Sequence, residues 1–493
     1  MRTNRNSTEL PDNHRYKGYT GKGMVEHVTE HCMEECDQWY EQHKSKLRFG
    51  DQLEQSDKRQ YVALLYALRG VFAENPKAPA VVQGVEHALY FKDKDPVPMS
   101  RKLPRLTPKQ KEVFSEETLA MLINGIIEFS TSEWATVPVF APKKDAEGGW
   151  TGIRTAIDYR YLNSLCVADC QSVPNMLETL ESLSQAAILS TFDGASGFWA
   201  CNLRKQDRKY AAFHAYMKGS WHLVQPRRMM FGFKNATGTY QRMMNLVYGP
   251  SVRGEGGVSD DALVGDIVEA FVDDSVTKSA KEEDHINDLA KVLIRLVNPQ
   301  NGERSVGSLW GTKVLPLLGH VVKCKQGIEA DPGKVHAMAA MKPPTYISDV
   351  RTFLGASGFL HRYVPEYSAF AGELRKLDDK SKSGAAEAQW SDSSLSAFES
   401  IKKALVSAPL LYFPDFNKPW IIACDSSNGQ LGAVLCQLDQ HGVERPIAYA
   451  STGLTDAQNR WGITYKEGLG VVWLRGSSGR ISNQGRVWSS QIM

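Results

Sequence analysis

The stretch EAFVDDSVTKS, residues 269–279, places two adjacent carboxylates inside an apolar run. Asp273 and Asp274 are flanked by Val272 and Val276. Unpaired carboxylates among core residues cost several kcal/mol unless a cation compensates them or water reaches them at a turn. The pair therefore indicates either a metal site or a hairpin tip.

The residues on both sides of the pair are typical of β-strands, so the sequence predicts a strand-turn-strand with the two aspartates at its tip. A tip can present both carboxylates to one cation, whereas adjacent residues of a straight strand point to opposite faces. A second segment, AILSTFDGASGFW, predicts a strand that runs into a turn at Asp193. With Asp193, a three-carboxylate centre would hold two divalent ions about 4 Å apart. The alternative, a plain polar turn, is the one that spacing alone favours.

The composition limits the class of protein and the way in which it could bind nucleic acid. With 493 residues, of which 42% are hydrophobic and 23% charged, the chain is globular material for about three or four domains. Its net charge is only +2, so a nucleic-acid partner must be held by a local basic surface.

The eight cysteines are scattered, which favours a reducing compartment. His31-Cys32 with Cys36 is compatible with half of a zinc site, but no second pair with finger-like spacing follows, so a helix carrying two thiols is the preferred interpretation. There is neither a signal core nor a run of about 18 apolar residues. We expect a soluble intracellular protein without a membrane segment, in a compartment that the sequence leaves unknown.

Local signals predict further elements. A helix is expected around residues 24–47, and another after the cap pair Thr107-Pro108. The segments 136–144 and 152–160 predict a hairpin with a glycine-containing loop.

Residues 204–234 combine basic and aromatic side chains with a single acid, Asp207. This mixture suits phosphate neutralisation together with base or sugar stacking. A solvated strand face with an aromatic core behind it explains the same pattern equally well.

Seven stretches in this order resemble the reverse transcriptase and following RNase H region of a gypsy-type LTR retrotransposon Pol polyprotein. They are WTGIRTAIDYRYLN, LSTFDGASGFWACNL, MMFGFKNATGTYQRMMN, AFVDDSVTKS, LLGHVV, DVRTFLGASGFLHRYV and ALVSAPLLYFPDFNKPWIIACDSSNGQLGAVLCQ. The resemblance covers roughly residues 83–474 and implies a transposable-element enzyme that binds nucleic acid.

The resemblance implies roles for individual residues. Asp193, Asp273 and Asp274 match the catalytic aspartates that hold two Mg²⁺ ions, for which Mn²⁺ is an alternative. The aromatic Phe198 matches the residue under the incoming sugar, and Phe231 lies in the matching Met-Phe-Gly turn beside the nucleotide. Two further matches, Lys143 and Arg154, would grip the nucleotide triphosphate, while Asp158 and Arg160 look structural or template-facing.

The fold implied by the resemblance is α+β: a right-hand polymerase with fingers, palm, thumb and connection and an antiparallel palm sheet, followed by an incomplete RNase H-like α/β domain. The expected division is an N-terminal extension of unknown function, partly helical, at 1–78; fingers and palm at 79–325; thumb and connection at 326–405; a truncated RNase H-like domain at 406–474; and a divergent tail at 475–493.

The chain departs from the family pattern at several places. Met230 and Thr237 replace two prolines that stiffen the turn beside the nucleotide pocket. The stretch PSVRGEGGVSDD is expected to be a surface loop, and residues 300–313 fit the family poorly, as a divergent or frame-damaged segment.

Asp425 and Glu467 match the first two RNase H carboxylates, but no Asp or Glu follows Glu467. A two-metal hydrolase without a ligand should not cut efficiently, so we expect RNase H endonuclease activity to be absent.

The function that we expect is RNA-directed DNA polymerase activity, a nucleotidyltransferase reaction at a primer 3′-hydroxyl. The partners would be an RNA or DNA template with a DNA primer, and deoxynucleoside triphosphates; other Pol domains are expected to be absent. A catalytically impaired remnant that still binds nucleic acid is the alternative, and a metal-dependent hydrolase is a weaker one.

Overall fold

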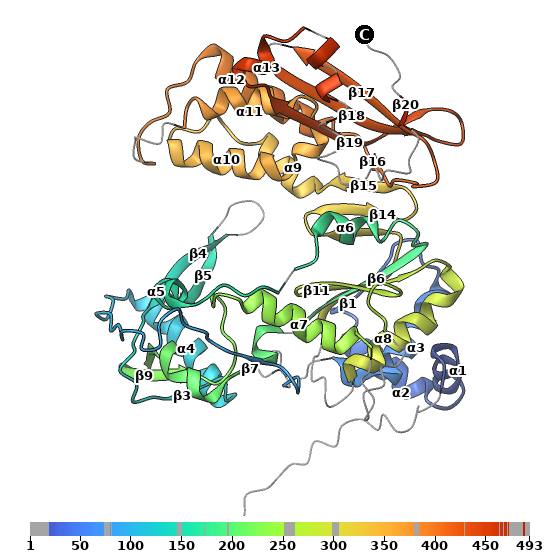
Figure 1. The fold of residues 1–493 in the computed structure, drawn as a ribbon. Coiled ribbons are helices and arrows are strands. Elements are labelled where there is room, and N and C mark those ends of the chain that lie inside the picture. Colours follow the sequence, from blue (N-terminus) through green and yellow to red (C-terminus); the bar gives the residue numbers. More distant parts are fainter. Residues whose placement is uncertain are drawn as a thin grey trace, which may run out of the picture. The chain divides into compact units, whose positions relative to one another are not determined.

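The computed structural model divides the chain into two compact units, Met1–Lys313 and Val314–Met493 (Figure 1). The boundary between the units falls before residue 314, and the predicted division into fingers and palm, thumb and connection, and RNase H-like domain stays a prediction. The structure describes residues 19–72, 79, 81–144, 150–171, 173–194, 197–250, 262–297, 305–378, 384–427, 429–462, 464–466, 468–470, 472 and 487–488.

A five-stranded sheet forms the centre of the first unit. Its strands lie in the order β1 (Leu47–Phe49), β12 (Ser305–Thr312), β6 (Ile188–Gly194), β11 (Asp274–Ser279) and β10 (Val268–Phe271). Neighbours are antiparallel except β1, which runs parallel to β12. The predicted strand-turn-strand around the two aspartates is therefore confirmed as β10 and β11.

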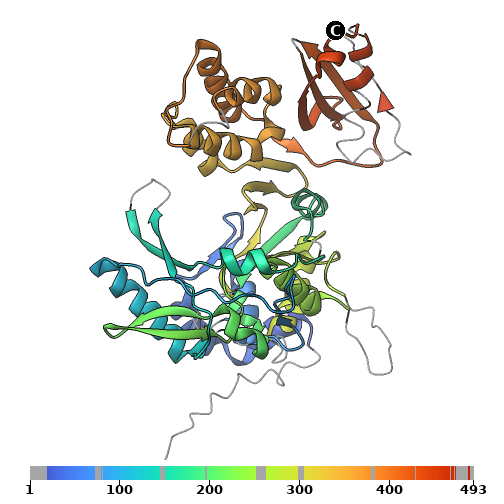
Figure 2. The same ribbon diagram turned by 60° about the vertical axis from the view of Figure 1, so that its left-hand side comes forward.

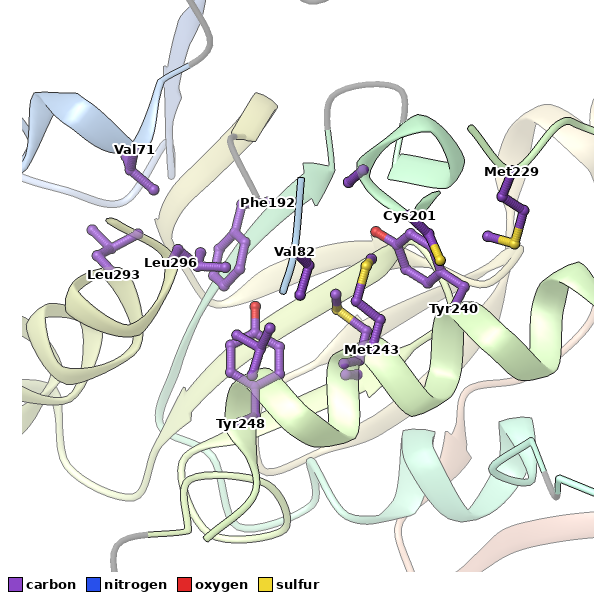
Figure 3. Close-up of a cluster of buried hydrophobic side chains, with 14 of the residues drawn as sticks. Val71, Val82, Phe192, Cys201, Met229, Tyr240, Met243, Tyr248, Leu293 and Leu296 are labelled. Carbon is purple, nitrogen blue, oxygen red and sulfur yellow. The ribbon is translucent and has the colours of Figure 1, made fainter. Parts of the chain in front are cut away.

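Helices α7 (Ala236–Tyr248) and α8 (His285–Val297) supply the apolar core beside this sheet. Figure 3 shows Phe192 of β6 in this core with Tyr248 of α7 and Leu296 of α8. Side chains alternate along a strand, so buried Ser190 and Phe192 belong to the same face of the sheet.

A buried histidine joins the sheet to α8. The two ring nitrogens of His285 lie 2.8 Å from Ser190 Oγ and 2.9 Å from Ser279 Oγ, and the Gly311 backbone N–H donates to Ser190 Oγ at 2.9 Å. Burial lowers the pKa of His285 to about 3. The ring is therefore neutral at physiological pH, so it can donate from one nitrogen and accept at the other.

The N-terminal segment completes the first unit. It contains η2 (Arg69–Val71), β1 and the helices α1 (Gly21–His31), α2 (Met33–His43) and α3 (Gln55–Ala67). Gln52 Nε2 donates to the Gly311 carbonyl at 2.8 Å, and Val71 belongs to the same core as Leu293 of α8 (Figure 3). Residues 19–72 are therefore part of the central sheet and its core, and the predicted single helix over 24–47 is interrupted at Cys32.

The remaining elements of the first unit include a three-stranded sheet ordered β3, β9, β8. The predicted hairpin is confirmed as β4 and β5, which project together in Figures 1 and 2. Thr107 caps the predicted helix with a reciprocal bond to Gln110. The bounds are β2 (Glu86–His87), α4 (Pro108–Ile123), β3 (Ile127–Phe129), β4 (Pro138–Lys144), β5 (Trp150–Ile157), α5 (Arg160–Leu165), α6 (Met176–Glu181), η3 (Gly197–Ala200), β7 (Asn202–Leu203), η4 (Lys205–Ala211), β8 (Phe213–Met217), β9 (Ser220–Pro226) and η6 (Glu282–Asp284).

The second unit contains two sheets and a group of helices. One sheet is ordered β13 (Val314–Leu317), β14 (His320–Lys323), β15 (Gly327–Ala330), β16 (Leu411–Tyr412), and the other β19 (Glu444–Gly453), β18 (Gln430–Leu438), β17 (Trp420–Ser427), β20 (Val487–Trp488). The helices are α9 (Pro332–Ala339), α10 (Ile347–Phe359), η7 (His361–Tyr363), α11 (Tyr367–Arg375), α12 (Asp392–Val406) and α13 (Asp456–Asn459).

Two segments that were expected to diverge from the family pattern contribute strands. Residues 305–312, within the segment 300–313, form β12 between β1 and β6, and Trp310 is fully buried. Val487 and Trp488, within the predicted tail 475–493, pair in parallel with β17. Of the predicted surface loop at 250–261, residues 251–261 lie outside the described residues.

The zinc hypothesis finds no support in the part of the chain that the structure describes, where no group of three His, Cys, Asp or Glu side chains is arranged to hold a metal. Cys32 and Cys36 are both buried free thiols. Among the described residues, no helix is long and apolar enough to cross a bilayer.

The docking of α1 on α8 is testable at Gly21. A Cβ at this position would lie 2.3 Å from the carbonyl oxygen of Ile286 and 2.9 Å from Ala290 Cβ. We expect Gly21→Ala to lower the free energy of unfolding by about 1–3 kcal/mol, because α1 must shift away from α8. Gly355→Ala is the control, since space is open at that exposed position of α10 and alanine favours helix by up to about 1 kcal/mol. Equal urea midpoints for Gly21→Ala and the parent would show that the helices do not dock as described.

Candidate functional site

The two adjacent aspartates lie at the turn between β10 and β11. β10 ends at Phe271 and β11 begins at Asp274, so Val272 and Asp273 form the turn. Asp274 pairs in register with Asp193, the residue near the end of β6. The backbone thus brings the three predicted carboxylate positions to one end of two paired strands, although the Asp193 side chain lies outside the described part of the structure.

Both described carboxylates are half-buried. Asp273 Oδ1 is buried and has no hydrogen-bond partner among the side chains and backbone groups that the structure describes. Burial raises the pKa of Asp273 above its usual range, and the neighbouring charge of Asp274 adds to the rise; burial alone raises the pKa of Asp274. An orphaned buried carboxylate oxygen beside a second carboxylate is a costly arrangement that a divalent cation would relieve. The residues present therefore fit a metal ion.

A glutamine that the sequence did not single out contacts the same turn. Gln241 of α7 accepts a hydrogen bond from the Val272 backbone N–H at 3.2 Å and donates to the Ala270 carbonyl at 3.3 Å. The residues around Gln241 do not predict this contact, because the turn lies about 30 residues further along the chain.

The two predicted aromatic residues adjoin each other. The ring centroids of Phe198 and Phe231 lie 4.8 Å apart, and Tyr240 of α7 meets Phe198 edge-on at 5.6 Å. Phe231 is 52% exposed. A Cβ at Gly197 would lie 2.5 Å from the Tyr240 ring, so glycine is required for this close packing. Phe198 is thus fixed beside an exposed aromatic surface.

Lys143 and Arg154 lie on the separate β4–β5 hairpin. Lys143 pairs with Gly152 and Arg154 with Ala141, so the two are diagonal neighbours. Their side chains lie outside what the structure describes, and their proposed contact with a triphosphate stays a prediction. Asp158 accepts a bidentate pair of hydrogen bonds from Arg160, at 2.8 and 2.9 Å, which lowers its pKa to about 2; the structural interpretation of this pair is supported.

Three arginines of the basic segment 204–234 form ion pairs within the protein. Arg204 pairs with Asp207, and both Arg208 and Arg227 pair with Glu128. Phe213 is fully buried. For these residues the structure favours the structural alternative over nucleic-acid contact.

In the second unit, Asp425 lies exposed on β17, paired with Gly432 of β18. Glu467 lies outside the described residues, so the match of these two residues to the first two RNase H carboxylates stays a prediction.

Comparisons with known proteins bear on both units. Residues 141–300 match the family described as reverse transcriptase (RNA-dependent DNA polymerase), and residues 390–476 match the RNase H-like domain found in reverse transcriptase. The first match contains every predicted aspartate, lysine, arginine and phenylalanine of the candidate polymerase site.

The similar curated proteins are Pol polyproteins of retrotransposons. That of transposon opus from Drosophila melanogaster is 30% identical over 72% of this chain and 34% of the relative, and that of transposon 297 is 28% identical over 86% and 37%. The polyprotein of transposon gypsy from the same organism is 26% identical over 85% and 39%. The chain thus spans about a third of the length of these relatives.

Solved structures support the predicted fold class. A foamy viral protease-reverse transcriptase (dRH) in complex with dsDNA matches with a TM-score of 0.74 and 20% identity, over 90% of this chain and 73% of the other. A complex of the foamy viral protein with an RNA/DNA hybrid matches with a TM-score of 0.72 and 19% identity, over 90% and 56%. At this identity the likeness shows the fold, and the predicted α+β class is confirmed.

The half-buried charge of Asp273 opposes folding, so we expect its removal to raise the free energy of unfolding. Since the folded-state pKa of Asp273 exceeds its unfolded value, folding favours the protonated carboxyl, and stability falls as pH rises from the unfolded pKa through the folded one. We expect Asp273→Asn to be more stable than the parent by about 1 kcal/mol near neutral pH in a chelator. The difference should shrink as pH falls toward about 4, near the unfolded pKa.

Urea denaturation at the two pH values measures this difference. Asp266→Asn is the control, because Asp266 is an exposed carboxylate just before β10, and it should leave stability unchanged at both. An Asp273→Asn variant no more stable than the parent near neutral pH would contradict the proposed burial of the charge.

Proposed function

We propose that this chain, which carries a reverse transcriptase domain at residues 141–300 and a reverse-transcriptase-type RNase H-like domain at 390–476, is an RNA-directed DNA polymerase that extends a primer on a nucleic-acid template. The observation that carries the proposal is the half-buried pair Asp273 and Asp274 at a hairpin turn, in register with Asp193 of the neighbouring strand. The relatives are retrotransposon Pol polyproteins, so the chain is proposed to serve the copying of such an element.

In this proposal the central sheet is the palm. Asp193, Asp273 and Asp274 would hold two divalent ions, which would be Mg²⁺, with Mn²⁺ as the alternative. The chemistry that bound ions supply is activation of the attacking oxygen and stabilisation of the leaving oxygen. The protein's own contribution is to hold Asp273 and Asp274 half-buried at one turn, where Asp273 Oδ1 would donate an electron pair to a bound ion. Because the turn is fixed, the carboxylates would not have to move during the reaction.

The remaining predicted residues would bind the incoming nucleotide. Phe198 is fixed between Phe231 and Tyr240, so it forms a rigid wall that can exclude a sugar 2′-hydroxyl. Lys143 and Arg154 on the β4–β5 hairpin provide a point charge and a planar fork for the triphosphate. The solved neighbours are complexes with dsDNA and an RNA/DNA hybrid, which supports a primer-template duplex as the partner of this chain.

The first test is Mg²⁺-dependent extension of a DNA primer on an RNA template. We expect the parent to extend the primer and the double variant Asp273→Asn with Asp274→Asn to extend it at least about 100-fold more slowly. Asp266→Asn, which changes an exposed carboxylate outside the turn, should extend like the parent. If the parent does not extend but binds primer-template as tightly as the double variant, the polymerase proposal fails and the impaired nucleic-acid-binding remnant is the better interpretation.

A second test concerns the choice of sugar. We expect Phe198→Val to lower the ratio of kcat/KM for a deoxynucleotide to that for the matching ribonucleotide by at least about 10-fold, since the wall against a 2′-hydroxyl recedes. Phe129→Leu, which changes an exposed phenylalanine on β3, should leave the ratio unchanged. An unchanged ratio in Phe198→Val would remove Phe198 from the nucleotide site.

A further inference from the structure

The turn that carries Asp273 has an unfavourable backbone. Two residues, Val272 and Asp273, connect β10 to β11, and Val272 has a φ of 52°. Asp273 is not among the residues with positive φ. A two-residue hairpin turn with positive φ at its first residue alone is the type II′ pattern, which favours glycine there. A β-branched side chain in this region is strained and persists only where the surroundings hold it.

Gln241 holds this turn by bonds to its backbone. The side-chain oxygen accepts from the Val272 N–H at 3.2 Å, while the side-chain nitrogen donates to the Ala270 carbonyl at 3.3 Å and to Asn245 Oδ1 at 3.2 Å. The residue is only 2% exposed. Since its oxygen faces a donor and its nitrogen faces two acceptors, only one orientation of the amide satisfies all three bonds.

The Val272 side chain is held as well. It packs, partly buried, against the hydrophobic core of the first unit. Glycine would relieve the strained φ but would lose this contact. The turn is therefore fixed from two sides, by apolar packing of the side chain and by the Gln241 amide on the backbone.

We infer that Gln241 is a positioning residue for the proposed reaction: it holds Val272 in its strained conformation and thereby sets the places of Asp273 and Asp274. This inference rests on the proposed function. Tyr240, the preceding residue of α7, contacts Phe198. One turn of α7 thus fixes both the proposed sugar wall and the metal-binding turn, so a small shift of α7 would move the two together.

The alternative is that Gln241 is merely a well-satisfied core residue, whose loss lowers stability and nothing more. Tyr248 gives a matched control. It is fully buried on the same helix, and its hydroxyl donates to the side-chain oxygen of Ser275 in β11 at 3.3 Å, whereas Gln241 bonds the backbone of the turn. Tyr248→Phe should therefore lower stability without affecting the carboxylates.

The experiment compares Gln241→Leu, Gln241→Glu and Tyr248→Phe in single-nucleotide incorporation, in primer-template binding, and in the rise of Tm that Mg²⁺ produces. We expect Gln241→Leu to lower kcat about 100-fold, with primer-template Kd within about 2-fold of the parent, because the carboxylates are displaced and the duplex surface is not. More Mg²⁺ should be needed for the same rise of Tm. Gln241→Glu keeps the bond to the Val272 N–H but loses the donor to Ala270, and its losses should be smaller.

A further variant tests the link to backbone strain. Glycine adopts a positive φ without penalty, so adding Val272→Gly to Gln241→Leu should recover about 10-fold of the lost kcat. A folded double variant with no recovery would overturn the link.

Two results overturn the inference as a whole. One is a folded Gln241→Leu variant that incorporates nucleotide and responds to Mg²⁺ like the parent; the other is a loss of kcat in Tyr248→Phe as large as that in Gln241→Leu. If Gln241→Leu does not fold, the same two comparisons are made with Gln241→Glu. A parent that incorporates no nucleotide overturns the proposed function instead, and the Mg²⁺-dependent rise of Tm then still decides whether Gln241 places the carboxylates.

Discussion

Two like-charged carboxylates held half-buried at one hairpin turn are the constraint on which the structure of the first unit depends. Such a pair opposes folding, since burial and mutual repulsion both penalise its charge. The surrounding elements compensate for this cost by fixing the turn: β6 pairs with β11, α7 reaches the turn through Gln241, and His285 joins α8 to the sheet. A cation at this turn would offset the cost of burying the two charges.

The sequence predicted the elements whose signals are local. The hairpin of β4 and β5 follows from two β-rich runs around a glycine-containing loop, and α4 begins where Thr107 and Gln110 form a capping box. The turn at Asp273 was likewise predictable, because a carboxylate pair in an apolar run has few acceptable places. The family resemblance supplied the roles that no local pattern could assign.

What could not be predicted depends on pairing between distant residues. Nothing in Leu47–Phe49 indicates that this short strand lies parallel to β12, and nothing in Ser305–Thr312 distinguishes a buried strand from a damaged segment. In the sequence, Gln241 is an ordinary polar residue of a helix, and only the folded structure shows that it contacts the backbone of the turn. For the basic segment the sequence left two alternatives open, and the ion pairs of three of its arginines with Asp207 and Glu128 favour the structural one.

The pairing of the N-terminal segment with β12 also has a consequence for the order of events during synthesis. Gln52 and its partner Gly311 are separated by 259 positions. At roughly 5–20 residues per second on the ribosome, the apolar faces of the first helices stay uncovered for tens of seconds before α8 and β12 emerge. Contacts of such high sequence separation make folding slow, so the newborn chain depends on protection from aggregation for longer than its local helices and hairpins alone would require.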